Sequence, residues 1–423
     1  MNCNPGTSAI RASTGTDTDN HTPVTALADL RVIEFCQIAA GPFCGMLLAD
    51  QGADVIKVEA PGGDGMRNWP PLNKGYSENF ASLNRNKRSI VLDLKDSSAR
   101  AQARALCLSA DVVVENFRPG VMARLGLSYR DLADQAPKIV YCSISAFGQE
   151  GPRAHEGGFD VTLQAIGGVM SVTGEPGGAS VKCGVPLTDF AAGLYAAYSI
   201  AAAVAAVRNG APGRHIDVPM FGTTLAIAAL QTSEYFGNQR DPVKLGSAHP
   251  RNAPYQAFRC KQGEIVLAAG TDELFRKACE CLGIAAIVDN PHFASTSLRA
   301  THQRELQALF EQALAKHTPD ESLALLRAAG VPCAPINSYS QALADPQVAY
   351  YGWVQPLDLP NGATTHTMTH PLGRSVPVRR RPPGLGEHTE EVLKEISAAG
   401  SATREALSEQ RHRDSEQDRP LER

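Results

Sequence analysis

The first half of the chain alternates strand-like and helix-like segments, and this alternation constrains the fold more than any other feature. Residues 31–36 and 53–59 are predicted strands on either side of residues 42–51, which have proline in the first turn of a predicted helix. The pattern continues with predicted strands at 89–94, 111–116 and 138–145 and a predicted helix at 97–110. Repeats of this kind predict an α/β protein with a Rossmann-like, mostly parallel, doubly wound sheet.

The first strand–helix turn lacks the features that nucleotide redox cofactors require. Its glycines, Gly41 and Gly45, are separated by Pro-Phe-Cys, which is not the GxGxxG spacing that lets a pyrophosphate approach the backbone. The sequence also contains no Walker P-loop. We therefore expect no nucleotide redox cofactor and no ATP-dependent chemistry.

A second pattern begins near residue 246. Two β-like stretches flank Lys261-Gln-Gly263 and predict a hairpin, followed by helices near 272–283, 302–316 and 320–329. A β-like stretch at 353–378 and a helix near 387–397 predict a return to the first unit. The expected domains are a large discontinuous domain (26–225 and 350–397), a smaller α+β domain (246–345), linkers at 226–245 and about 346–352, and disordered tails at 1–25 and 398–423.

Composition restricts the partners and the compartment. Forty basic and 44 acidic residues give a net charge of −4, which provides no broad field for nucleic acid or an anionic membrane. The ten cysteines show no CxxC pair and no zinc-like spacing, so we expect reduced thiols, no metal and a cytoplasmic protein. Residues 190–207 are uncharged but alanine-rich, which favours a buried helix over a membrane span.

Seven segments of the chain form a distinctive ordered set. They are AGPFCGMLLADQGADVIKVEAPGGD, NRNKRSIVLDLK, ADVVVENFRPGVMARLGL, IVYCSISAFGQEGP, GGFDVTLQAIGGVMSVTGEPGG, GVPLTDFAAGLYAA and LGEHTEEVLKEI. In this order they resemble the class III CoA-transferases, the family of formyl-CoA and carnitine CoA-transferases. The resemblance implies transfer of coenzyme A from an acyl-CoA to a free carboxylic acid. It also implies a homodimer of two interlocked chains, with active sites between the large and small domains.

By this resemblance Asp189, between GVPLT and FAAG, is the nucleophile. Its predicted place just before the alanine-rich helix agrees with that role, because free backbone N–H groups and the helix dipole favour an ionised carboxylate. The implied intermediates are an acyl-aspartyl anhydride and an aspartyl-CoA thioester. From local sequence alone, a plain helix N-cap is the favoured role. Asp160 matches an acidic partner beside the thioester, and its alternative is a turn or cap aspartate.

Phe159 separates two activities that share this fold. The related α-methylacyl-CoA racemases have His-Asp where this chain has Phe159-Asp160. Racemisation needs a base on each face of the α-carbon, and phenylalanine cannot move a proton. We therefore favour a transferase, with a racemase or a non-catalytic acyl-CoA-binding protein as the alternatives.

The resemblance also assigns the contacts to coenzyme A. The positions that match residues lining the nucleotide, pantetheine and thioester are Gln37, Ile38, Ala39, Leu92, Lys95, Asn116, Phe117, Arg124 and Phe159. An arginine such as Arg124 can pair with a phosphate in bidentate fashion. Taken one at a time, each lysine or arginine is also compatible with a solvated surface charge.

The chain departs from the formyl-CoA transferases near the reaction centre. Gly157 replaces a lysine, Ala60 replaces a basic residue, and residues 246–252 stand where those enzymes have a tetraglycine loop. This loop, with the following PYQAF, resembles the succinyl-CoA-dependent dicarboxylate transferases, in which case His249 and Arg251 hold a second carboxylate. The alternative is that both are ordinary loop residues. The donor and acceptor acids do not follow from the sequence.

Overall fold

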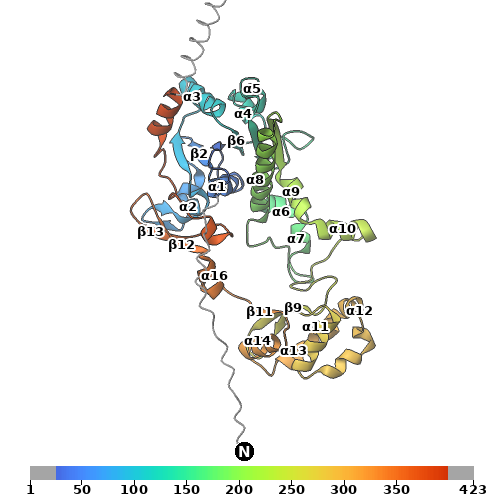
Figure 1. The fold of residues 1–423 in the computed structure, drawn as a ribbon. Coiled ribbons are helices and arrows are strands. Elements are labelled where there is room, and N and C mark those ends of the chain that lie inside the picture. Colours follow the sequence, from blue (N-terminus) through green and yellow to red (C-terminus); the bar gives the residue numbers. More distant parts are fainter. Residues whose placement is uncertain (1–24, 399–423) are drawn as a thin grey trace, which may run out of the picture.

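A sheet of six parallel strands forms the centre of the computed structural model, which describes residues 25–398 (Figure 1). Val32 of the central strand pairs with Val55 on one side and with Val112 on the other. In sheet order the strands are β5 (Arg88–Val91), β2 (Asp54–Glu59), β1 (Arg31–Phe35), β6 (Val112–Glu115), β7 (Val140–Ser145) and β8 (Arg214–Pro219). Numbered among themselves, these strands follow the order 3-2-1-4-5-6 of doubly wound sheets.

Helices cover both faces of this sheet, which explains why its central strands β1, β6 and β7 are buried along almost their whole length. On one face, Cys44 and Ala192 belong to a core formed with the strands, and on the other Leu106 and Val392 do so. The covering helices are α1 (Ala40–Asp50) and α8 (Leu187–Arg208) on the first face, and α3 (Ser97–Leu108), α5 (Tyr129–Leu132) and a helix that includes residues 389–398 on the second. The predicted α/β fold with a mostly parallel sheet is confirmed.

Residues 253–336 build a second hydrophobic core of their own, centred on Phe258, Phe275 and Phe310. Figure 1 shows this small unit joined to the main sheet by two connecting segments. Its elements are β9 (Tyr255–Arg259), β10 (Glu264–Ala268), β11 (Cys333–Pro335), α11 (Asp272–Cys281), α12 (Thr296–Thr301), α13 (Gln303–Leu314) and α14 (Pro319–Ala328). The predicted hairpin and helices are present, whereas β11, which extends the hairpin to a three-stranded antiparallel sheet, was not predicted.

Both segments that the sequence suggested as linkers contain helices. α10 (Ala229–Asn238) occupies much of the first and α16 (Pro346–Tyr351) most of the second. The β-like stretch after them forms a hairpin of β12 (Val354–Asp358) and β13 (Thr364–Met368). The remaining elements are 3₁₀ turns at Gly65–Asn68, Ala285–Asp289, Pro291–Phe293 and Gly373–Ser375, and β3 (Leu72–Asn73), β4 (Tyr76–Ser77), α2 (Glu78–Asn84), α4 (Val121–Arg124), α6 (Asp160–Ile166), α7 (Val169–Val172), α9 (Met220–Ile227) and α15 (Tyr339–Leu343).

α8 is only partly the buried helix that the sequence predicted. Its inner side packs against α1 and the sheet, while Leu194 and Tyr198 on its other side are 54% and 72% exposed. By length and composition it is the one helix among residues 25–398 that could cross a membrane. The two predicted disordered tails fall outside the described residues, apart from residues 25 and 398.

Candidate active site

A cavity of about 680 Å³ opens where the strand order of the main sheet reverses, between β1 and β6. In doubly wound sheets this switch point, at the carboxyl ends of the strands, is the usual place for a ligand. The segments that follow β1, β6 and β7 line the cavity together with the first turn of α8. Among its lining residues are Gln37, Ile38, Ala39, Asn116, Phe117, Phe159 and Asp189.

Asp189 lies inside α8 rather than before it, which corrects the expectation from the sequence. The helix begins at Leu187, so the carboxylate stands in its first turn. Its side chain accepts no hydrogen bond from residues 25–398, and burial together with the nearby charge of Asp160 raises the pKa of Asp189 to about 7. The shift opposes the expected preference for the ionised form, because burial and the like charge of Asp160 both favour the neutral carboxyl group.

Asp160 holds the start of α8 in place. Its Oδ1 accepts hydrogen bonds from the backbone N–H and the hydroxyl of Thr188, at 2.9 and 2.8 Å. Its Oδ2 accepts a third from Gln164 at 2.7 Å, and Gln164 in turn accepts from the N–H of Cys183. Through these hydrogen bonds, the carboxylate of Asp160 fixes the position of Thr188, the residue that precedes Asp189.

The two sides of the switch point are joined by a reciprocal pair of hydrogen bonds. The Gln37 N–H donates to Asn116 Oδ1 and the Asn116 amide donates to the Gln37 carbonyl, both at 2.9 Å. Below them, Glu115 is 3% exposed and accepts from the Phe117 N–H at 2.9 Å. Burial raises the pKa of Glu115 to about 7. The loop after β6 is thus fixed from both sides.

Two arginines at this cavity were not singled out from the sequence: Arg118 lies in the segment ADVVVENFRPGVMARLGL, and Arg153 directly follows the segment IVYCSISAFGQEGP. Arg153 pairs with Glu156 through bonds of 2.9 and 2.6 Å and stacks on Phe147, so its charge is already compensated. The guanidinium of Arg118 makes no hydrogen bond or ion pair with any residue in the described range. Its guanidinium occupies the space beside Gly157, where a Cβ would lie 3.1 Å from Nη2.

Three predicted coenzyme A contacts lie outside the residues that line the cavity. Leu92 is 4% exposed and belongs to the core cluster on which Phe117 packs. Lys95 and Arg124 are exposed. The structure therefore brings together seven predicted site residues at this cavity and leaves these three outside its lining: the seven are Gln37, Ile38, Ala39, Asn116, Phe117, Phe159 and Asp189.

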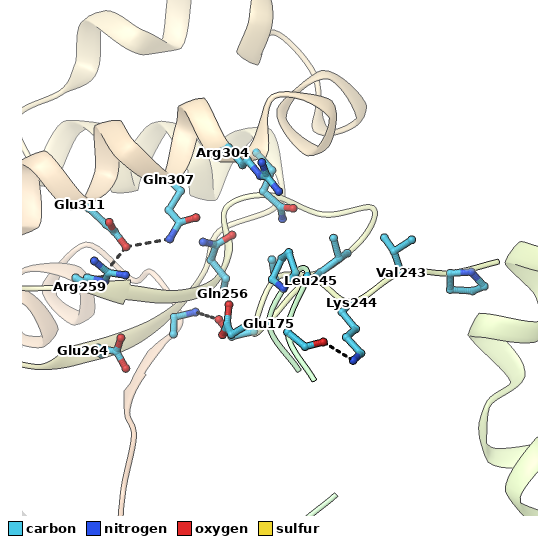
Figure 2. Close-up of a pocket in the computed structure, with 18 of the residues that line it drawn as sticks. Glu175, Val243, Lys244, Leu245, Gln256, Arg259, Glu264, Arg304, Gln307 and Glu311 are labelled. Atoms are coloured by element: carbon cyan, nitrogen blue, oxygen red, sulfur yellow. Dashed lines mark hydrogen bonds between the residues drawn. The ribbon is translucent and has the colours of Figure 1, made fainter. Parts of the chain in front are cut away.

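The loop at 246–252 borders a different cavity, of about 790 Å³, between residues 175–178, residues 242–248 and the small unit (Figure 2). Lys244 joins two of its walls by donating to the carbonyls of Gly178 and Ala179. His249 and Arg251 line neither cavity. Arg251 pairs with Glu234 of α10 at 2.7 Å, so in this chain its charge already has a partner.

One cluster in residues 25–398 has a geometry that could hold a metal ion. His292, His302 and Glu305 converge on the surface of the small unit, with the two imidazole rings stacked at 4.0 Å. A 2.9 Å hydrogen bond between His292 and Glu305 is sufficient to explain why these side chains lie together. The cluster shares no residue with the Asp189 cavity. The nine cysteines in the described range are all free.

Comparison with known proteins decides the family. The model of CoA-transferase family III matches residues 27–389. The chain belongs to this family. As a class III CoA-transferase it is 39% identical to a succinate–glutarate CoA-transferase of Agrobacterium fabrum, over 90% of this chain and 98% of the relative. It is 34% identical to the human succinyl-CoA:glutarate CoA-transferase, over 90% and 89%.

A solved structure supports the same assignment. A CAIB/BAIF family protein from Brucella suis superposes on this transferase with a TM-score of 0.77 at 36% identity, over 89% of this chain and 99% of that one. The similarity covers both the sheet and the small unit. The resemblance drawn from the seven sequence segments is therefore confirmed.

Proposed function

We propose that this enzyme transfers coenzyme A from succinyl-CoA, or another short dicarboxylyl-CoA, to a dicarboxylic acid, with Asp189 as the covalent nucleophile. The observation that carries the proposal is the place of Asp189: a carboxylate with no hydrogen-bond partner among residues 25–398, facing a switch-point cavity that can hold a CoA ester. The names of the relatives support the dicarboxylate class, since several are transferases between succinyl-CoA and a second dicarboxylate.

The proposed reaction proceeds by two anhydride exchanges at one carboxyl group. A carboxylate oxygen of Asp189 attacks the thioester carbonyl and expels CoA thiolate, which leaves an acyl-aspartyl anhydride. The thiolate then attacks the aspartyl carbonyl, releases the donor acid and forms an aspartyl-CoA thioester. The acceptor carboxylate attacks this thioester and repeats both steps in reverse. Each step exchanges one activated acyl group for another, so no external energy source is required.

The pKa of Asp189 fits this chemistry in a specific way. At a pKa of about 7, roughly half of the carboxyl groups are ionised at neutral pH in the empty site. Only the ionised form attacks. Because burial leaves this carboxylate incompletely solvated by water, it is the more reactive as a nucleophile. Phe159, 75% exposed at the cavity, cannot act as a base, which argues against racemisation of the α-carbon.

Assembly and compartment are part of the same proposal. Exposed apolar side chains on α8 and α10, including Tyr198 and Phe236 at 72% and 73%, support a homodimer that covers this surface. We propose the interlocked form that the family resemblance implies, in the cytoplasm, without a metal or nucleotide cofactor and without nucleic-acid or membrane partners.

The domain boundaries and the remaining contacts also stand as proposals. The large domain comprises 26–225 and 350–397, and the small domain 246–345. Leu92, Lys95 and Arg124 contribute to the nucleotide end of the CoA site, while His249 and Arg251 bind the distal carboxylate of the acid once a partner chain completes the site.

The test is an acceptor screen with trapping of the intermediate. Purified enzyme is incubated with succinyl-CoA and glutarate, mesaconate, citramalate or oxalate, and new CoA esters are measured by mass spectrometry. Hydroxylamine should convert the Asp189 side chain to a hydroxamate only when succinyl-CoA is present. Asp189→Asn should abolish transfer, whereas Asp320→Asn, a first-turn aspartate of α14, should not. Full transfer by Asp189→Asn would remove this residue from the mechanism.

A further inference from the structure

Ile38, in the wall of the Asp189 cavity, has a backbone φ of 68°. A β-branched residue rarely adopts this left-handed conformation, because its Cβ crowds the adjoining carbonyl. Such a conformation persists only where the surroundings enforce it. The groups that hold Ile38 are therefore of interest for the cavity itself.

The carboxylate of Asp64 holds the backbone of Ile38. The Ile38 N–H donates to both oxygens of Asp64, at 3.1 and 3.2 Å, and the Met66 N–H donates to Oδ1 at 3.0 Å. Asp64 is only 1% exposed. Burial alone would raise the pKa of Asp64, but the Lys57 ammonium and the backbone hydrogen bonds outweigh it and hold this pKa below its usual value. The Ile38 N–H therefore donates to a charged carboxylate.

Lys57 fixes the other side of the same turn. Its Nζ lies 2.9 Å from Asp64 Oδ2 and donates to the Cys36 carbonyl oxygen at 2.6 Å. Glu34 is its second carboxylate partner, at 3.1 Å. Lys57 is fully buried. The Lys57 ammonium therefore binds the Cys36 carbonyl directly, and it holds the Ile38 N–H indirectly, through Asp64.

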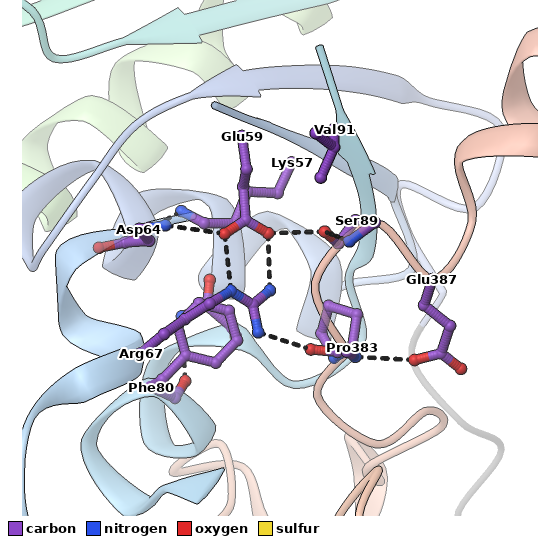
Figure 3. Close-up of polar contacts among 12 residues, drawn as sticks. Lys57, Glu59, Asp64, Arg67, Phe80, Ser89, Val91, Pro383 and Glu387 are labelled. Carbon is purple, nitrogen blue, oxygen red and sulfur yellow. Dashed lines mark hydrogen bonds and ion pairs between the residues drawn. The ribbon is translucent and has the colours of Figure 1, made fainter. Parts of the chain in front are cut away.

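The network continues from Asp64 to the C-terminal segment (Figure 3). The Asp64 N–H donates to Glu59 at 3.0 Å, and Glu59 accepts two bonds from Arg67 and one from the Ser89 hydroxyl. Arg67 also donates to the carbonyl of Pro383. These hydrogen bonds fix the backbone of Asp64, so its carboxylate stays in place if the backbone of Ile38 moves.

We propose that Asp64 is a positioning residue for CoA transfer, which locks Ile38 in its left-handed conformation and so fixes the cavity wall against which the acyl-CoA lies. This inference rests on the proposed function. It predicts that the loss of activity on replacing Asp64 depends on which residue occupies position 38. Glycine adopts positive φ without a steric cost, so a glycine there needs no enforcement.

The test is a double-mutant cycle of Asp64→Ala and Ile38→Gly, read by kcat and KM and by CoA affinity in calorimetry. Asp64→Ala should lower kcat/KM at least tenfold and weaken CoA binding. In the Ile38→Gly background the same change should cost several-fold less. Asp64→Asn, which keeps one acceptor oxygen for Ile38 and Met66, should fall between wild type and Asp64→Ala. Equal losses in the two backgrounds would overturn the inference.

Asp50→Ala serves as the structural control. Asp50 is equally buried and pairs with Arg85 at 2.6 Å, but it lies at the far end of α1, about 15 Å along the helix from Ala40 at the cavity. It should lower the melting temperature as Asp64→Ala does without the coupling to position 38. An inactive wild type would refute the proposed function, while the calorimetric cycle would still decide the role of Asp64.

Discussion

The backbone N–H of Thr188 donates a 2.9 Å hydrogen bond to Oδ1 of Asp160, and this bond joins the first residue of α6 to the residue before the proposed nucleophile. The two aspartates are 29 residues apart in sequence, so neither position alone reveals the link. Asp160 acts on Asp189 in two ways: it fixes the start of α8, and its negative charge contributes to the raised pKa of Asp189.

Asp160→Asn should move the acid limb of the pH–rate profile to lower pH. Asparagine keeps an acceptor oxygen for Thr188 but removes the like charge, which lowers the pKa of Asp189. Its amide also faces the donor group of Gln164, so we expect kcat to fall about tenfold through the lost hydrogen bond. A profile with an unchanged midpoint would contradict the electrostatic part of this account.

Asp189→Asn should stabilise the protein at alkaline pH. Because the folded-state pKa of about 7 exceeds the ordinary value of 3.8, the folded protein binds more protons than the unfolded chain between those values, and stability is lost as pH rises through this window. Removing the carboxyl should raise the unfolding free energy by about 1–4 kcal/mol at pH 8 and by little near pH 4. Denaturant unfolding at both pH values measures this difference, and an equal effect at both would contradict it.

Gly193→Ala should destabilise the protein although alanine favours helices. A Cβ at Gly193 would lie 2.7 Å from the carbonyl oxygen of Ala40, so α8 would have to move away from α1 and carry Asp189 with it. We expect a loss of about 1–3 kcal/mol from overpacking. The matched control is Gly237→Ala in α10, where nothing lies within 4 Å and a gain of about 0.5–1 kcal/mol is expected. Thermal unfolding of both variants decides the point.

Local sequence predicted the strands and most helices, because their hydrophobic periods are local properties. It could not predict that β1 and β6 are neighbours, which places residues 37–39 beside 116–118 and creates the cavity. The start of α8 was missed by a few residues because Pro186 and Leu187 lie in a stretch without helical periodicity. Desolvation of Asp189 was missed for a related reason: it depends on α6 and on the loop after β1, which are remote in sequence.

The family resemblance supplied the nucleophile, and the structure supplies partners that no motif specifies. Asp64 stands in a quoted segment, APGGD, yet its bond to Ile38 requires the turn after β1 to fold back over residues 64–66. Arg118 likewise stands in ENFRPG. That its guanidinium has no partner among residues 25–398 is visible only when the surroundings of Gly157 are known.

Arg118→Ala should raise the KM for the acyl-CoA about tenfold to a hundredfold with a smaller change in kcat. Its unpaired guanidinium at the cavity is suited to an anionic group of the CoA ester, and a charge-assisted hydrogen bond contributes about 1.5–3 kcal/mol. Arg276→Ala, an exposed arginine of the small unit, is the control and should change neither constant.

A lysine at position 157 should compensate for the loss of Arg118. Gly157 lies against the guanidinium, so a side chain there enters the same corner of the cavity and can supply the missing charge. Gly157→Lys alone should raise the KM for the acyl-CoA, because the lysine displaces Arg118. Gly157→Lys combined with Arg118→Ala should recover part of the affinity that Arg118→Ala loses. Steady-state kinetics with both substrates separate the two anions: a change confined to the KM of the free acid would mean that Arg118 binds the carboxylate of the acceptor instead.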